Sequence, residues 1–245
     1  MRRYLQLSRT RSYSFLFALP LLLAYEVGAA WLNARPAGTG LRNGADVLLR
    51  SLLAAGGVSG TLPFAGVLVI LAGAAIVAER RRSRVPLEAR VFAGMLGESA
   101  VLGAIFGVVI GTATYWILGG LLPRLAVDQA LGGVSFAEGV VLSLGAGVYE
   151  ELVFRVLLVG GLLAILRATG MRRSRAGPAA ALLAALAFSA FHYLGPYGDS
   201  WALASFAFRF VAGLAFSGLY LARGFGITAW THALYDVFLL VGMGP

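Results

Sequence analysis

Long apolar stretches, separated by short arginine-rich or glycine-containing segments, follow one another along the whole chain. Seven of them are predicted to form membrane-spanning helices, since about 20 helical residues cross the hydrocarbon core of a bilayer. They cover residues 13–32, 58–78, 91–122, 136–168, 178–193, 201–221 and 227–241. A short amphipathic helix is expected at 45–55, and the count becomes eight if it also enters the membrane. The pattern predicts an all-α polytopic membrane protein without a soluble domain.

Two of these stretches carry further packing information. The apolar run at 13–32 is longer than the apolar part of a signal peptide, so we expect an uncleaved first helix in which Glu26 faces protein. In the third stretch Gly103, Gly107 and Gly111 recur every four residues. Such a repeat favours close approach of a neighbouring membrane helix.

Composition supports the membrane assignment. Hydrophobic residues make up 59% of the chain and charged residues 13%, whereas soluble domains carry about 25% charged residues. All 20 basic residues are arginine. Most lie in 1–12, 79–90 and 167–177, which predicts a cytoplasmic amino terminus and contacts with anionic lipid, with no nucleic-acid partner. The absence of cysteine excludes disulfides and thiolate chemistry.

The most unusual residues of the chain are Glu150, Glu151 and Arg155, in the middle of the 136–168 stretch. Each ion costs roughly 2.5–3.5 kcal/mol to place at the centre of a membrane helix. Glu151 and Arg155 are one helical turn apart and can neutralise one another. Glu150 lies about 100° round the helix from Glu151 and is less easily paired. The trio is therefore either a structural ion cluster or part of a functional site.

The histidines favour a functional site. The chain has two, His192 and His232, and both fall in apolar stretches. Phe188 precedes His192 by one turn, and Asp236 follows His232 by one turn. Either histidine alone would more often be a satisfied buried residue. Together with the glutamates they form a set of intramembrane ionisable groups, which mark function by default.

Two chemistries fit this set, and a third is disfavoured. A carboxylate beside an imidazole can take a proton from water, and a second imidazole can stabilise an oxyanion, which indicates hydrolysis of an amide or ester. A Ser/His/Asp triad is disfavoured because neither Ser143 nor Ser189 lies in a nucleophile-elbow motif such as G-x-S-x-G. Glu150, His192 and His232 would also satisfy a catalytic zinc ion, although no H-E-x-x-H motif is present.

The three motifs, in order, are E-E-x-x-x-R, F-x-x-x-H and H-x-x-x-D. This series resembles the CPBP family of CAAX proteases and bacteriocin-processing enzymes, which includes the type II CAAX prenyl endopeptidases. The resemblance covers about 136–241, the expected catalytic core of a single membrane domain spanning 1–245, and leaves 1–122 as accessory helices. One position departs from the family, whose last motif most often ends in Asn where this chain has Asp236.

The resemblance implies an intramembrane endopeptidase with a polar cavity open to the membrane. It implies that Glu150 and His192 activate water and that His232 and Asp236 form the oxyanion side, while Glu151, Arg155 and Phe188 support them. No cofactor is expected, with zinc as the alternative. Because an ionised Asp cannot donate a hydrogen bond, Asp236 is either protonated or orients His232.

Several interpretations stay open at this level. The expected substrate is a membrane-anchored or lipid-proximal peptide or protein, in a bacterial-type cytoplasmic membrane. The alternatives are a non-enzymatic bacteriocin-immunity or membrane-chaperone protein on the same scaffold, and a proton-coupled transporter, which the lack of repeats or paired broken helices disfavours. Outside the motifs, Arg209 is expected to pair with Glu26, Glu98 or a cavity carboxylate. Tyr149, Tyr193 and Tyr235 are expected to pack as aromatics. The sequence does not specify the oligomeric state.

Overall fold

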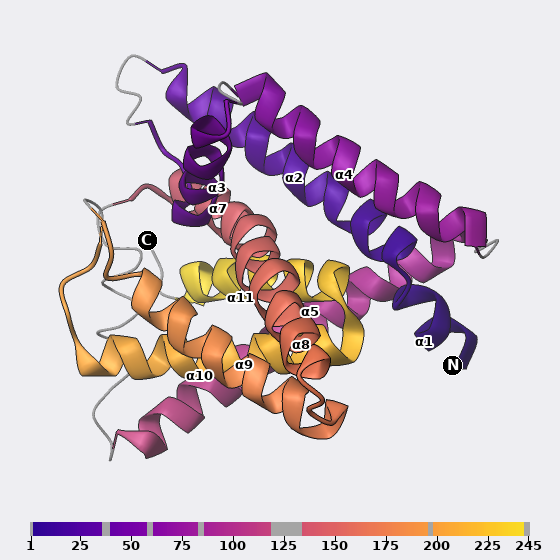
Figure 1. Ribbon diagram of the computed structural model, residues 1–245. Helices are drawn as coiled ribbons and strands as arrows, with labels where there is room; N and C mark the ends of the chain where they lie inside the picture. Colours follow the sequence, from indigo (N-terminus) through magenta and orange to yellow (C-terminus); the bar gives the residue numbers. More distant parts are fainter. Residues whose placement is uncertain are drawn as a thin grey trace.

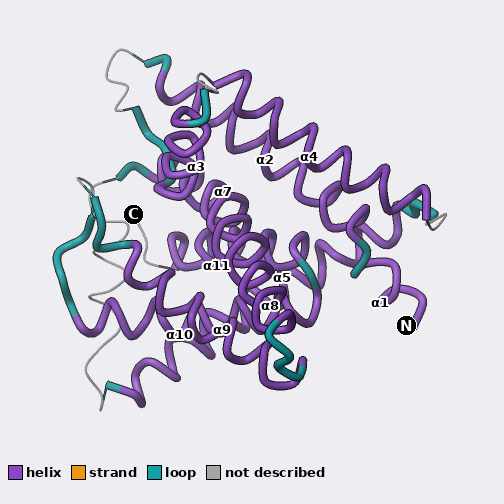
Figure 2. The backbone as a smooth tube through the Cα atoms, viewed as in Figure 1, coloured by secondary structure: helices purple, strands orange, loops and turns teal. Residues whose placement is uncertain are grey.

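The computed structural model describes residues 2–35, 40–57, 61–82, 86–118, 134–195 and 198–242. Helices joined by short connections make up these ranges, which contain no β-strand (Figures 1 and 2). The helices are α1 (Arg2–Ser8), α2 (Arg11–Asn33), α3 (Gly44–Ala55), α4 (Thr61–Arg82), α5 (Ala89–Ile117), α7 (Phe136–Gly145), η1 (Ala146–Val159), α8 (Gly160–Ala168), α9 (Arg173–Phe191), α10 (Leu203–Arg223) and α11 (Phe225–Gly242). The connection predicted between the apolar stretches at 91–122 and 136–168 lies almost entirely outside the described residues.

The chain is a polytopic helical membrane protein. Within the described ranges, 5 helices are long and apolar enough to cross a membrane, namely α2, α5, α9, α10 and α11. This is fewer than the seven or eight expected. The stretch at 136–168 is divided into three shorter helical segments, and several side chains of α4 lie outside the described part. Pro20 does not interrupt α2, which runs unbroken from Arg11 to Asn33.

A continuous helical rod of α7, η1 and α8 runs through the middle of the molecule (Figure 1). It begins at Ser135, whose side chain accepts from the Glu138 N–H while Glu138 reaches back to the Ser135 N–H. The central segment η1 is a π-helix of 14 residues, closed at its end by a bond from the Gly160 N–H to the Arg155 carbonyl. Such wide helical turns are rare and are frequent at functional sites. Both glutamates of the first motif lie on this segment.

Glycines on the rod allow its neighbours to approach closely. A Cβ at Gly147 would lie 2.5 Å from the Ala229 carbonyl oxygen on α11. A Cβ at Gly145 would lie 2.5 Å from the Tyr25 ring on α2. These contacts leave no room for a side chain, so the two glycines set the distance between the rod and the helices that complete the site.

Of the three repeated glycines on α5, one lies at a close helix–helix contact. A Cβ at Gly103 would lie 3.1 Å from the Tyr235 backbone nitrogen on α11, so α5 and α11 meet here. At Gly107 and Gly111, no atom of the described residues lies within 4 Å of the corresponding position. The predicted packing surface is therefore confirmed for Gly103 and wrong for the other two.

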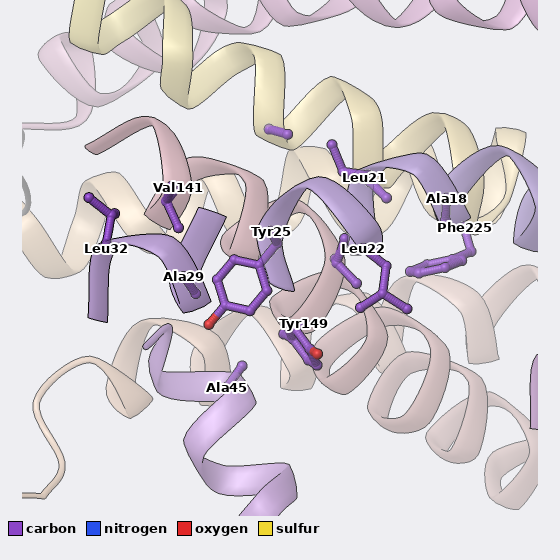
Figure 3. Packing of buried hydrophobic residues seen from close by; sticks show 13 residues of the cluster. Ala18, Leu21, Leu22, Tyr25, Ala29, Leu32, Ala45, Val141, Tyr149 and Phe225 are labelled. Atoms are coloured by element: carbon purple, nitrogen blue, oxygen red, sulfur yellow. The ribbon is translucent and has the colours of Figure 1, made fainter. Parts of the chain in front are cut away.

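A hydrophobic cluster forms where α2, α3, the rod and α11 meet. Tyr25 and Tyr149 contact one another edge to face, with ring centroids 5.2 Å apart, and Ala45 of α3 lies beside them (Figure 3). The cluster brings the amino-terminal helices against the face of the rod that carries the first motif. The site is thus built from both halves of the chain.

Candidate active site

Glu150 lies on η1 and is 8% exposed. Its Oε1 atom accepts a hydrogen bond of 2.9 Å from Nδ2 of Asn43, in the connection before α3. Sequence reasoning missed Asn43. An Asn before a predicted helix signals an N-cap, but no sequence signal links it to a glutamate 107 residues away.

His192 follows directly on the end of α9. Its Nδ1 atom lies 2.9 Å from the Phe188 carbonyl oxygen. A carbonyl oxygen only accepts, so Nδ1 carries the hydrogen and the neutral imidazole has its lone pair on Nε2. The Phe188 ring packs edge to face against the imidazole, with centroids 4.9 Å apart. The structure therefore leaves the lone pair of His192 on Nε2, which makes no hydrogen bond within the described part of the chain.

Glu150 and His192 belong to one electrostatic environment. The two side chains interact electrostatically, and each has a hydrogen-bond partner of its own, Asn43 and the Phe188 carbonyl respectively. No direct hydrogen bond or ion pair joins the two side chains in the part of the chain that is described. The described contacts of the two side chains therefore show an electrostatic interaction between them and no direct bond.

His232 on α11 is held between two carboxylates. Its Nδ1 atom lies 2.6 Å from Oε1 of Glu151. Its Nε2 atom lies 3.6 Å from Oδ2 of Asp236, which is too long for a hydrogen bond but within electrostatic reach. The Phe216 ring stacks on the imidazole at 4.4 Å between centroids. These contacts fix the plane of the imidazole ring, and its Nε2 atom points toward Asp236.

Glu151 and Arg155 form the ion pair that their spacing predicted. The Arg155 Nε atom lies 3.1 Å from Oε2 of Glu151, and both side chains are almost fully buried. The guanidinium carbon lies 4.6 Å from the centre of the Phe188 ring, a cation–π arrangement. Because its other oxygen bonds His232, Glu151 links the first motif to the third.

A four-residue ion network lies beside the Asn43 segment. Arg42 contacts Glu26 at 2.9 Å and Asp46 at 3.1 Å, and Arg50 contacts the same two carboxylates at 3.0 and 2.5 Å. The Tyr149 hydroxyl donates to Glu26 at 2.6 Å. Glu26 therefore faces protein, as expected, and Tyr149 adds a hydrogen bond to its aromatic packing.

Arg209 does not pair with any of the expected partners. Its guanidinium contacts Asp199, in the connection between α9 and α10, while Glu98 pairs with Arg223. The Asp199 N–H donates to the His192 carbonyl at 2.8 Å. The Arg209–Asp199 pair thus supports the connection next to His192, an arrangement that no local sequence pattern revealed.

The remaining polar candidates make backbone contacts. The Ser143 and Ser189 hydroxyls donate to the carbonyls of Gly139 and Phe206 at 2.8 and 2.7 Å. The Tyr193 hydroxyl lies 3.2 Å from the Ala202 carbonyl. Neither serine hydroxyl is positioned as a nucleophile beside a histidine, in agreement with the expectation against a serine triad.

The placement of the acidic and histidine side chains bears on the zinc alternative. Among the residues that the structure describes, no group of three or more His, Asp and Glu side chains is arranged to hold a metal ion. The alternative zinc set of Glu150, His192 and His232 is therefore not assembled as a ligand cluster in this arrangement. Metal dependence stays a prediction for experiment.

Comparison with known proteins identifies one family. Residues 133–238 match the family described as type II CAAX prenyl endopeptidase Rce1-like. No curated protein and no solved structure matches the chain. The matched segment contains all three motifs and confirms the resemblance seen in the sequence. Asn43 and the ion network beside it lie outside that segment.

Proposed function

We propose that the protein is an intramembrane endopeptidase, because residues 133–238 match the family described as type II CAAX prenyl endopeptidase Rce1-like. It hydrolyses a peptide bond of a membrane-anchored or lipid-proximal protein or peptide. The observation that carries this proposal is the pair of Glu150, a buried carboxylate, and His192, an imidazole whose Nε2 is free to accept.

The proposed reaction begins with a water molecule between Glu150 and His192. The Glu150 carboxylate takes one proton, His192 Nε2 accepts a hydrogen bond from the other, and the water oxygen attacks the scissile carbonyl carbon. The carbonyl oxygen becomes an oxyanion. Collapse of this tetrahedral intermediate breaks the carbon–nitrogen bond, and the proton held by Glu150 passes to the leaving amine.

His232 is the proposed oxyanion donor. Protonated, its imidazole donates Nδ1–H to Glu151 and presents Nε2–H to the substrate oxygen. Asp236, 3.6 Å from Nε2, favours the imidazolium by charge and orients it. An ionised Asp236 contributes no donor of its own, so we assign it the orienting role.

The step needs no metal, because a carboxylate and two imidazoles supply the base and the electrophile; purified protein is expected to retain activity after treatment with a strong chelator. If activity is lost and returns with added zinc, the metal alternative replaces this scheme.

The proposed topology places the amino terminus in the cytoplasm, since most arginines lie on that side. We propose that α4 and the rod also cross the bilayer, giving seven spans in a bacterial-type cytoplasmic membrane. The rod, Phe136 to Ala168, is long enough to do so as one continuous element. Substrate then reaches the site from within the bilayer.

The test compares membranes that contain wild type, Glu150→Gln or Glu138→Gln, after equal insertion and accumulation have been verified. Glu138 is a partly exposed glutamate at the start of the same rod, where its carboxylate accepts the Ser135 N–H, and is the matched control. Mass spectrometry is expected to detect new termini of membrane-anchored proteins with wild type and Glu138→Gln, and none with Glu150→Gln. Identical products from all three would contradict the proposal and favour a non-enzymatic binding role.

A further inference from the structure

Asn43 reaches the proposed catalytic base from a part of the chain outside the matched family segment. Its Nδ2 atom donates to Oε1 of Glu150 at 2.9 Å, and both side chains are buried. Among the described residues, this is the hydrogen bond that Glu150 makes through its side chain. A buried carboxylate depends strongly on such a bond, because loss of a partner to a charged group leaves it poorly solvated.

The orientation of the Asn43 amide is determined by its surroundings. Its Oδ1 atom accepts the Ala45 N–H at 2.9 Å, the N-cap bond of α3. Since a backbone N–H can only donate, the oxygen must lie on that side. Nδ2 is left to face Glu150, and the amide cannot be reversed without losing both bonds.

The backbone of Asn43 is held as well. Its N–H donates to the Tyr25 hydroxyl at 3.0 Å, and that hydroxyl donates to Asp46 at 2.8 Å. Gly145 on the rod lies so close that a Cβ there would be 3.0 Å from Cβ of Asn43. The flanking Arg42 is paired with Glu26 and Asp46. Both the backbone and the side-chain amide of Asn43 are therefore held in place by hydrogen bonds.

We propose that Asn43 is a positioning residue of the active site, which binds one carboxylate oxygen of Glu150 and leaves the other oxygen to activate water. This inference rests on the proposed function, because it assigns Glu150 as the base. It also makes the helices before residue 133 part of the catalytic apparatus, since the segment 133–238 does not contain this donor.

A purely structural role for Asn43, as an N-cap, makes a different prediction. Ser is as good an N-cap as Asn, so Asn43→Ser preserves the start of α3 but removes the amide donor. Ser135→Ala is the matched control, because it removes the cap of the rod without changing any contact of Glu150. Asn43→Asp keeps the shape and the cap acceptor, and places an oxygen where the donor was.

The experiment is an infrared pH titration of the purified proteins in nanodiscs of neutral lipid, which needs no substrate. The Glu150 carboxyl band is the signal that Glu150→Gln lacks. A hydrogen bond to an ionised carboxylate favours ionisation, so its loss in Asn43→Ser is expected to raise the titration midpoint by about one pH unit or more. Ser135→Ala is expected to leave the midpoint unchanged.

An unshifted midpoint in folded Asn43→Ser would overturn the positioning role. Should that variant not fold, Asn43→Asp decides, since an added carboxylate oxygen must also raise the midpoint, and an unchanged value would again refute the proposal. The proposed function fails separately, if Glu150→Gln forms the same cleavage products as wild type. If the positioning role and the proposed function are both correct, the pH at which kcat/KM falls on the acid side shifts in the Asn43 variant by the same amount as the infrared midpoint. This is measured with a precursor whose cleavage depends on Glu150.

Discussion

Glu151 on η1 and His232 on α11 are 81 residues apart in the chain and are joined by a contact of 2.6 Å between Oε1 and Nδ1. The second carboxylate oxygen of Glu151 pairs with Arg155 at 3.1 Å. One buried carboxylate thus neutralises a guanidinium and orients an imidazole. The packing of η1 on α11 and the geometry of the proposed oxyanion donor depend on the same side chain.

Replacing Glu151 is expected to destabilise the protein more than replacing its partner Arg155. Glu151→Met leaves the Arg155 guanidinium buried without its carboxylate, a change that costs about 3–5 kcal/mol. Arg155→Met is expected to cost less, because Glu151 keeps its contact with His232. Thermal unfolding in detergent, monitored by circular dichroism, measures both changes.

The double variant Glu151→Met/Arg155→Met provides the control for that comparison. Replacing a whole buried ion pair by apolar side chains is often nearly neutral, so the double variant should be more stable than Glu151→Met alone. If Arg155→Met proves the more damaging single change, the bridging role assigned to Glu151 is wrong.

Substitution by alanine is expected to reduce stability and activity at Gly103 but not at Gly107. Gly103→Ala places a Cβ 3.1 Å from the Tyr235 nitrogen and 3.2 Å from the Thr231 carbonyl oxygen, which flank His232. Pushing α11 away should cost about 1–3 kcal/mol of stability and reduce cleavage. Gly107→Ala, with open space at its Cβ, should retain wild-type stability and activity. Equal behaviour of the two variants would contradict the described α5–α11 contact.

Asp236→Asn is expected to remain active. The Asp236 oxygen lies 3.6 Å from His232 Nε2, too far for a hydrogen bond, and an amide of the same shape can occupy the site while also offering a donor. Measured kcat/KM should stay within about tenfold of wild type, or about 1.4 kcal/mol. Asp236→Leu should lose more. An inactive Asp236→Asn would show that the carboxylate itself is required.

Glu79 is expected to stabilise the protein at neutral pH and not in acid. Partial burial raises the pKa of its carboxyl, but hydrogen bonds from Ser12 and Arg11, at the start of α2, outweigh it and hold the pKa below its ordinary range. A lowered folded-state pKa gives stability that is present above the unfolded-state pKa. That contribution disappears as the pH falls through the folded-state value.

The measurement for Glu79 is the difference in unfolding temperature between wild type and Glu79→Gln. At about pH 7 the wild type should be more stable by about 1 kcal/mol, the usual effect of losing a helix cap. At about pH 3 the difference should shrink, because the pH is then below the unfolded-state pKa and approaches the lowered folded-state pKa, so part of this stabilisation is lost. A difference that is constant with pH would refute this role.

Local patterns predicted much of the molecule. Apolar stretches identified the helices, since side-chain hydropathy directly reflects burial in lipid; the expected helix at 136–168 has the bounds of the α7–η1–α8 rod. Helical spacing identified the Glu151–Arg155 pair and the Phe188–His192 contact. Each of these depends on residues within one turn of each other.

Features set by tertiary packing were not predictable. The π-helical form of η1 has no local signal in its residues. Asn43 meets Glu150 only because α3 docks on the rod, a contact over 107 residues. Arg209 was expected to pair elsewhere, but Asp199 lies nearer in the fold. Gly107 and Gly111 resemble Gly103 in sequence, yet only Gly103 faces α11.

The most direct test of the central claim is the rate of cleavage of one Glu150-dependent precursor by purified protein in proteoliposomes. Rates under single-turnover conditions are compared for wild type, Glu138→Gln and Glu150→Gln. The three proteins must first be shown to have equal unfolding temperatures, so that a difference in rate does not reflect a difference in folding. Loss of a general base is expected to slow Glu150→Gln by about 100-fold or more, while Glu138→Gln matches wild type. A Glu150→Gln protein that cleaves at the wild-type rate would contradict the assignment of Glu150 as the base.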